Sequence, residues 1–212
     1  MKKGIIFDLD GTLWDSTETV LPAWNDSLKD GGCELTLPAL RALMGKTMEQ
    51  IGGLLMPQLP LERQIEIMRG CFARELPLLR ANGAKTYPFL KETLETLAKD
   101  YTLAVVSNCQ IGYIEAFIEH YRFEGIISDH ECVGRTGKSK GENIALVCER
   151  NGIESAVYVG DTQGDLDAAD AARLPFIWAS YGFGTIDRDE PKIDSLSELP
   201  ALVDRMTNGK RQ

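Results

Sequence analysis

The sequence predicts an α/β protein with a parallel sheet covered by helices on both faces and an all-helical unit inserted after the first strand. Three observations predict it. Short, continuously apolar runs recur along the chain, helical patterns lie between them, and one long stretch near the N-terminus has helical patterns only. Continuous apolarity is typical of strands buried on both faces, and strands that alternate with helices form right-handed βαβ units.

Four apolar runs predict the strands, and small, acidic or polar residues follow each run at once. They span residues 5–7, 103–106, 156–159 and 176–178, and Ile126-Ile127 indicates one more strand. The expected core is therefore a three-layer, doubly wound parallel sheet. Helical spacing is found at residues 90–97 and 111–121, and a further helical stretch from Asn143 ends at Asn151-Gly152.

Residues from about 15 to 82 break this alternation, because no strand-like run occurs there. Apolar residues at helical spacing indicate helices at 20–28, 40–43, 48–55 and 61–79. We therefore expect an α/β core made of residues 1–14 and 83–212, and a helical cap domain at residues 15–82. An insertion at this point would cover the carboxyl ends of the strands, where open α/β sheets bind their ligands.

Composition excludes several classes of protein. The 212 residues include 32 acidic and 23 basic ones, for a net charge of -9, and the basic residues are scattered, which argues against a nucleic-acid partner. No apolar run is long enough to span a membrane, and the run before Asp8 is too short for a signal peptide, so we expect a cytoplasmic protein. Five cysteines without a CxxC pair indicate reduced thiols. Both a monomer and a homodimer are compatible with the sequence.

Two acidic motifs follow predicted strands. Asp8 and Asp10 come directly after the first strand, with Gly11 allowing a close turn, and Asp161 and Asp165 follow the strand at 156–159. Four acids meeting at one edge of a sheet would repel one another unless a cation held them. Their hard oxygen ligands suit Mg²⁺.

Two further segments of the sequence have residues that suit the binding of a phosphate group. Ser107-Asn108 follows the strand at 103–106 and offers a hydroxyl, an amide and free backbone N–H groups. The loop at residues 137–143 is glycine-rich, leads into a helix and carries Lys138 and Lys140. One lysine near the carboxylates would hold both the acids and a substrate phosphate.

Taken in order, DxDGT, Ser-Asn, Lys and GDxxxD resemble the haloacid dehalogenase superfamily, over nearly the whole chain. The sequence is most similar to the phosphoglycolate phosphatase and β-phosphoglucomutase branch with a helical cap, judged from residues 10–16, Tyr87-Pro88 and residues 181–184. One feature departs from the pattern. Relatives often have Lys-Pro before the third helix, whereas Lys138 and Lys140 compete for that role here. We favour Lys140, which directly precedes the Gly-Glu-Asn start of the helix.

The resemblance implies a magnesium-dependent phosphatase acting on a small phosphorylated metabolite. Asp8 would attack phosphorus to form an aspartyl phosphate, and Asp10 would protonate the leaving group and then activate water. Asp10 favours phosphoryl transfer over dehalogenation, because a departing halide needs no acid. Mg²⁺ would be bound by Asp8, the Asp10 carbonyl and Asp161, with Asp165 bound directly or through water.

The resemblance also implies a substrate site. Ser107, the Asn108 backbone and Lys140 would bind the phosphoryl oxygens, and the cap would determine which substrate is accepted. The cap loop that contains Lys46 lies where similar enzymes contact the substrate, so Lys46 is the expected contact to a polar or anionic group. The same residues would also serve a phosphosugar mutase, and a non-catalytic phosphate-binding module is the alternative from another class.

Overall fold

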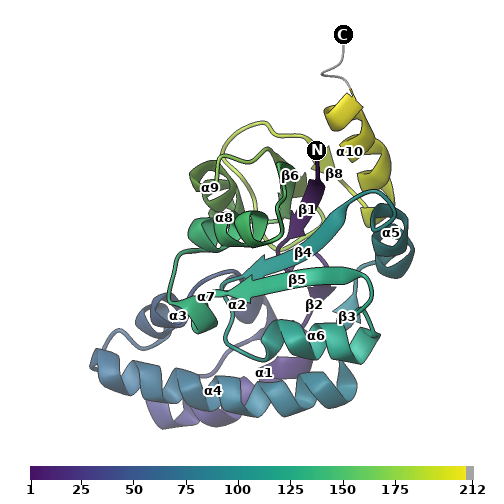
Figure 1. Ribbon diagram of the computed structural model, residues 1–212. Helices are drawn as coiled ribbons and strands as arrows, with labels where there is room; N and C mark the ends of the chain where they lie inside the picture. The colour runs from purple at the N-terminus through teal and green to yellow at the C-terminus, as the bar shows by residue number, and fades with distance from the viewer. Residues whose placement is uncertain (209–212) are drawn as a thin grey trace.

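The computed structural model describes residues 1–208. Within them, six parallel strands form one sheet in the order β5-β4-β1-β6-β7-β8, with helices on both faces (Figure 1). The strands are β1 (Lys3–Phe7), β4 (Thr102–Ser107), β5 (Ile127–Cys132), β6 (Ser155–Gly160), β7 (Phe176–Ala179) and β8 (Lys192–Ile193). The predicted doubly wound sheet is confirmed, and β1 lies at its centre.

The apolar runs explain why helices cover both faces of the sheet. Along β1, Ile5 and Phe7 pack into one hydrophobic cluster, whereas Ile6 between them packs into a second one, and all three are fully buried. Successive side chains of a strand point to opposite faces, so a strand with apolar residues at every position needs cover on both.

Helices supply that cover. The first cluster includes residues of α5 (Leu90–Leu97), α6 (Tyr113–Tyr121) and α10 (Leu199–Asn208), and the second includes residues of α8 (Lys140–Arg150) and α9 (Gln163–Ala171). Short elements complete this part of the chain: α7 (Val133–Thr136) and the 3₁₀ turn η2 (Leu196–Glu198). Two expected starts were wrong. α8 begins at Lys140 rather than Asn143, and Ile111 lies before α6 and is 55% exposed.

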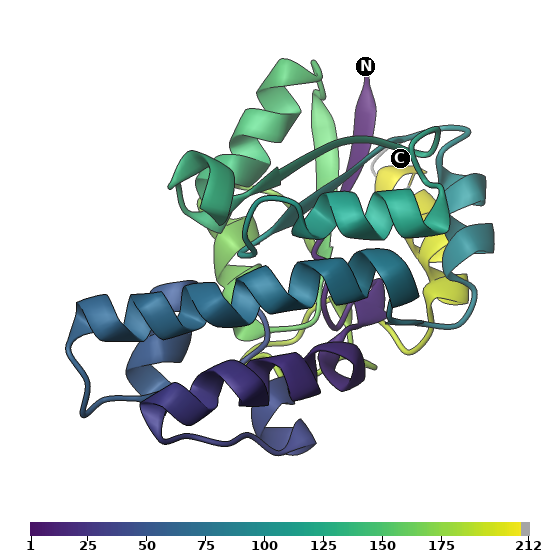
Figure 2. The same ribbon diagram turned by 90° about the horizontal axis from the view of Figure 1, so that it is seen from below.

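All four helices indicated between the first two core strands are present. They are α1 (Thr17–Leu28), α2 (Leu37–Arg41), α3 (Met48–Leu55) and α4 (Leu61–Asn82), with a 3₁₀ turn, η1 (Lys29–Gly31), after α1. Figure 2 shows α4 between α1 and α6 of the core. At the base of the insertion, β2 (Trp14–Asp15) pairs antiparallel with β3 (Lys85–Thr86), a ribbon that the sequence did not indicate.

The helical insertion is joined to the core by polar contacts as well as by the two chain crossings. The side-chain amide of Asn108 donates a hydrogen bond to the Gly45 carbonyl over 2.7 Å, and Gln110 donates one to Glu75. These contacts place the carboxyl end of β4 against the loop before α3 and against α4. Among residues 1–208, the structure has no helix whose length and hydropathy would allow it to cross a bilayer.

Candidate active site

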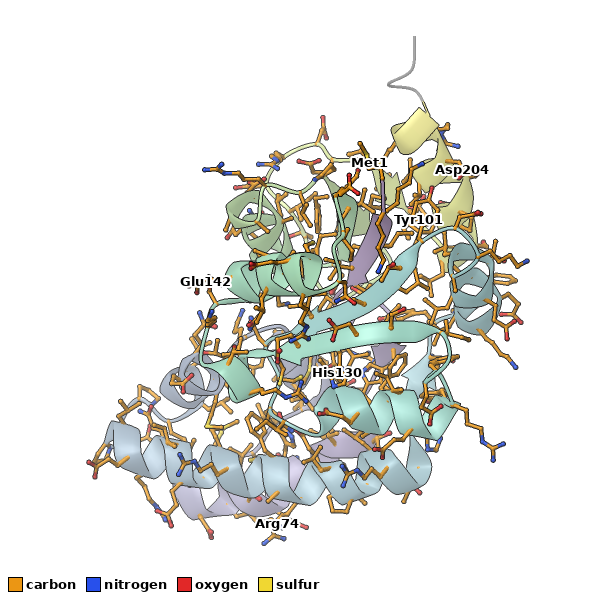
Figure 3. The ribbon with its side chains drawn as sticks, in the orientation of Figure 1. Met1, Arg74, Tyr101, His130, Glu142 and Asp204 are labelled. Carbon is orange, nitrogen blue, oxygen red and sulfur yellow. The ribbon has the colours of Figure 1, made fainter. Side chains whose placement is uncertain are left out.

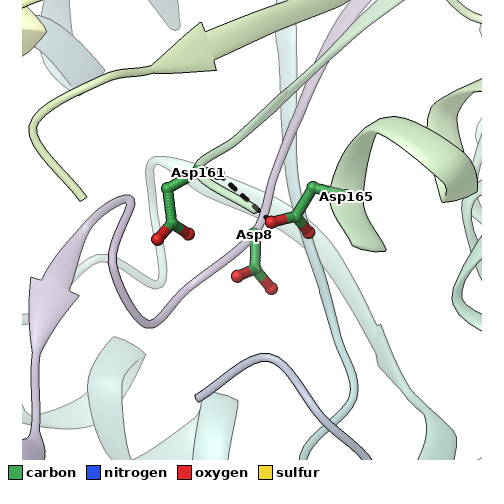
Figure 4. A group of neighbouring side chains, drawn as sticks. All are labelled: Asp8, Asp161 and Asp165. Atoms are coloured by element: carbon green, nitrogen blue, oxygen red, sulfur yellow. Dashed lines mark hydrogen bonds between the residues drawn. The ribbon is translucent and has the colours of Figure 1, made fainter. Parts of the chain in front are cut away.

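Three carboxylates meet at the carboxyl ends of β1 and β6. Asp8 follows β1, Asp161 follows β6, and Asp165 lies in the first turn of α9, as Figure 4 shows. One oxygen from each lies within 4.8 Å of the others, and all three residues are fully buried. β1 and β6 are adjacent and in register, so the residues that follow both strands reach the same edge of the sheet.

Lys140 lies inside this cluster. Its Nζ is 2.9 Å from Asp8 Oδ1 and 2.7 Å from Asp165 Oδ1, and the residue is buried, whereas Lys138 is exposed. The start of α8 fixes this geometry, because Ser139 and Glu142 form a capping box around its first turn. Of the two candidate lysines, Lys140 is therefore the one that lies next to the acids.

The charges of the cluster favour a further cation. Three acids and one lysine leave an excess of negative charge in a buried site, and Asp8 Oδ2 is buried without a hydrogen-bond partner among the described residues. A buried acceptor that lacks a donor is costly. Carboxylate oxygens in this arrangement suit a hard divalent ion, so the residues fit Mg²⁺.

The pKa shifts of the three acids also favour a bound cation. Burial, and then the charge of Asp165, raise the pKa of Asp8 to about 6 although Lys140 opposes the shift. Burial and the charges of Asp165 and Asp8 raise the pKa of Asp161 well above its usual range. The pKa of Asp165 is lowered despite its burial, chiefly because Lys140 is close. Without another cation, the carboxylates are thus not all stable in the ionised form.

Backbone loops pack tightly around Asp161. Its Oδ2 accepts a hydrogen bond of 2.7 Å from the Phe183 backbone N–H. A Cβ built on Gly11, whose φ is +87°, would lie 2.2 Å from that oxygen, and a Cβ on Gly182 would lie 2.3 Å from the Asp161 Cβ. Only glycine fits at these two positions. The contact from Phe183 was not predicted, because it depends on a loop that follows β7.

Asp10 does not belong to the group of three, contrary to the expectation that four acids converge. Its carboxylate accepts a hydrogen bond from Ser16 Oγ over 2.5 Å, and Ser16 in turn accepts one from Tyr113 over 2.8 Å. Burial, opposed by the hydrogen bond from Ser16, raises the pKa of Asp10 to about 7. The Asp10 side chain therefore belongs to a separate hydrogen-bond network with Ser16 and Tyr113, beside the acid cluster.

A cavity of about 40 Å³ lies between the core and the helical insertion. Asp10, Ser107 and Asn108 line it from the core, and Lys46 and Glu75 line it from the insertion. Ser107 is buried at the end of β4, and Lys46 is exposed. The structure thus brings every candidate site residue predicted from the sequence either to the acid cluster or to this cavity.

Comparison with known proteins agrees with the predicted resemblance. The family model for haloacid dehalogenase-like hydrolases matches residues 5–179. A phosphoglycolate phosphatase of Shigella boydii serotype 4 (strain Sb227) is 28% identical, over 94% of this chain and 92% of that protein.

Two solved structures have the same fold. A predicted phosphatase from Clostridium acetobutylicum gives a TM-score of 0.83 at 22% identity, over 96% of this chain and 98% of that one. CbbY from Rhodobacter sphaeroides, solved in complex with phosphate, gives a TM-score of 0.78 at 22% identity, over 96% of this chain and 100% of that one. The match over residues 5–179 shows that this chain belongs to the family of haloacid dehalogenase-like hydrolases.

Proposed function

We propose that this hydrolase is a magnesium-dependent phosphatase that cleaves a small phosphomonoester through an aspartyl phosphate. The observation that carries the proposal is the buried carboxylate of Asp8, which has Lys140 on one oxygen and no partner within residues 1–208 on the other. The similarity to proteins named phosphoglycolate phosphatase supports the same reaction class.

Asp8 is the proposed nucleophile. A carboxylate oxygen attacks phosphorus, the P–O bond to the leaving group breaks, and the phosphoryl group remains on Asp8 as an acyl phosphate. Asp10 donates a proton to the departing alkoxide. A pKa of about 7 suits this acid, since it is partly protonated near neutral pH and can then accept a proton from the attacking water. Hydrolysis of the acyl phosphate releases inorganic phosphate and regenerates Asp8.

The proposed metal site uses Asp8, Asp161, the Asp10 carbonyl and Asp165, the last either directly or through water. Bound Mg²⁺ would neutralise the excess negative charge and allow an anionic substrate to approach an anionic nucleophile. Lys140, Ser107 and Asn108 are the proposed donors to the phosphoryl oxygens. Residues 15–82 are the proposed cap domain, which covers the leaving group and limits access of water.

A panel of phosphorylated metabolites, assayed for phosphate release with and without Mg²⁺, tests the function. We expect turnover of small phosphomonoesters that stops when EDTA removes the metal and returns when Mg²⁺ is added. Steady release without a sugar bisphosphate activator would also separate a phosphatase from a phosphosugar mutase. Absence of metal-dependent turnover across the whole panel would overturn the proposal.

The role proposed for Lys46 gives a second test. Lys46→Ala is expected to lower kcat/KM several-fold for substrates with a polar or anionic leaving group, since a hydrogen bond at a solvent-exposed site contributes about 1 kcal/mol. The matched control is Lys99→Ala, which removes another exposed lysine that lines no cavity lined by Lys46. Equal specificity constants for wild type and Lys46→Ala on the best substrate would exclude the contact.

A further inference from the structure

A buried acid lies in the helical insertion, apart from the acid cluster. Glu75 belongs to α4 and is only 2% exposed, whereas its neighbour Arg74 points to solvent (Figure 3). Acidic side chains are rarely buried to this extent unless they are paired or have a function. The ion pairs found among residues 1–208 include none to Glu75.

Within the part of the chain that the structure describes, only neutral donors bind Glu75. The indole N–H of Trp24 donates to Oε2, and the side-chain amide of Gln110, in the loop after β4, donates to Oε1. A carboxylate offers about four acceptor positions, so about two remain free. Burial raises the pKa of Glu75 to about 8, because these two hydrogen bonds only partly offset the cost of removing the carboxylate from water.

Glu75 lines the same cavity as Asp10, the proposed acid of the reaction. Trp24 and Phe72 line it too and make its insertion side largely apolar. At about 40 Å³ the cavity can hold a few heavy atoms, and it shares Lys46 and Asn108 with a larger cavity of about 1020 Å³. A leaving group protonated by Asp10 would therefore enter a cavity that Glu75 also lines.

We propose that Glu75 determines specificity by accepting a hydrogen bond from the leaving group, so that the enzyme prefers substrates whose leaving group carries a hydroxyl or amino donor. The inference rests on the proposed phosphatase function and narrows its substrate class. Above pH 8, where Glu75 is ionised, a substrate carboxylate at this position would face a second negative charge in a buried, apolar site, which is unfavourable. A hydroxyl or amino donor could instead use an acceptor position of Glu75 that Trp24 and Gln110 do not occupy.

Three small substrates of similar size test the preference in the wild-type enzyme. They are 2-hydroxyethyl phosphate, 2-aminoethyl phosphate and 2-phosphoglycolate, which differ only in the end of the leaving group. At pH 9, where Glu75 is ionised, we expect kcat/KM for at least one of the two donor substrates to exceed that for 2-phosphoglycolate by roughly tenfold or more, as for a hydrogen bond to a charged group. The first two compounds distinguish a hydroxyl site from an amine site. Equal or greater activity on 2-phosphoglycolate would overturn the inference.

The variant Glu75→Gln separates selection from positioning of the helical insertion. The amide keeps the shape of the side chain, so a purely structural role would change kcat/KM for all three substrates by one common factor. Selection by the carboxylate predicts that the ratio of donor substrate to 2-phosphoglycolate falls roughly ten- to a hundredfold. An unchanged ratio would contradict the proposal.

Controls keep the two proposals distinct. Glu62→Gln removes an exposed acid from the same helix and should leave the ratio unchanged. If wild type released no phosphate from any phosphomonoester of the metabolite panel, these three compounds included, the proposed function would fail. Turnover without the predicted ratio would refute the role of Glu75 alone. If Glu75→Gln did not fold, the wild-type series would still decide.

Discussion

Asp8→Asn is expected to lower the rate of phosphate release by about 10⁴-fold or more, because an amide cannot act as the nucleophile that forms the acyl phosphate. The substitution keeps the size of the side chain and an oxygen that can accept the hydrogen bond from Lys140. Hydrolysis of p-nitrophenyl phosphate with Mg²⁺ present is the measurement. Activity within a factor of ten of wild type would exclude Asp8 as the nucleophile.

The same variant should fold at least as stably as wild type. Burial and Asp165 raise the pKa of Asp8 to about 6, so the protonated form is favoured in the fold and wild type loses stability as the pH rises from about 4 through 6. Asn has no such titration. Urea denaturation in EDTA should show an advantage of Asp8→Asn over wild type that is larger at pH 8 than at pH 5. Asp187→Asn, at an exposed acid, is the control for both experiments.

Lys140→Met is expected to destabilise the protein by about 3 kcal/mol or more in the absence of divalent metal. The buried ammonium lies within 2.9 Å of one oxygen of Asp8 and 2.7 Å of one oxygen of Asp165, and its removal leaves both carboxylates without a compensating charge. Urea denaturation measures the loss, and phosphate release should fall as well. Lys138→Met changes an exposed lysine two positions away and should unfold like wild type.

A double variant tests whether the loss comes from these charges. Asp8→Asn combined with Lys140→Met leaves one fewer uncompensated carboxylate, so Asp8→Asn should stabilise the Lys140→Met protein by more than it stabilises wild type. Strict additivity of the two single changes would show that Lys140 stabilises the fold through packing of its aliphatic stem instead.

The sequence was sufficient for the parts of the fold that depend on local pattern. Continuous apolar runs identified the strands at 103–106 and 156–159, because a strand covered on both faces leaves no position for polar residues. The acids of the cluster could be found for a related reason. Parallel strands end at one edge of a sheet, so residues that follow separate strands must meet there.

Other features depend on tertiary context. The ribbon of β2 and β3 has only two residues in each strand, too few for any periodicity, and β8 is equally short. Glu75 follows Arg74 in a helix with many charged residues, so its sequence neighbourhood is typical of a solvated face. Only the packing of α4 against Trp24 and the loop after β4 buries it.

The position of β1 has a consequence for how the chain reaches its native state. This strand is synthesised first, yet it lies at the centre of the sheet, and its partners β4 and β6 follow only after the whole helical insertion. Until then its apolar residues and unpaired backbone groups have no strand to pair with on the emerging chain. Pairing between strands that are far apart in the sequence slows folding and leaves aggregation-prone intermediates exposed. The nascent chain therefore leaves β1 unpaired, and open to aggregation, until β4 and β6 have been synthesised.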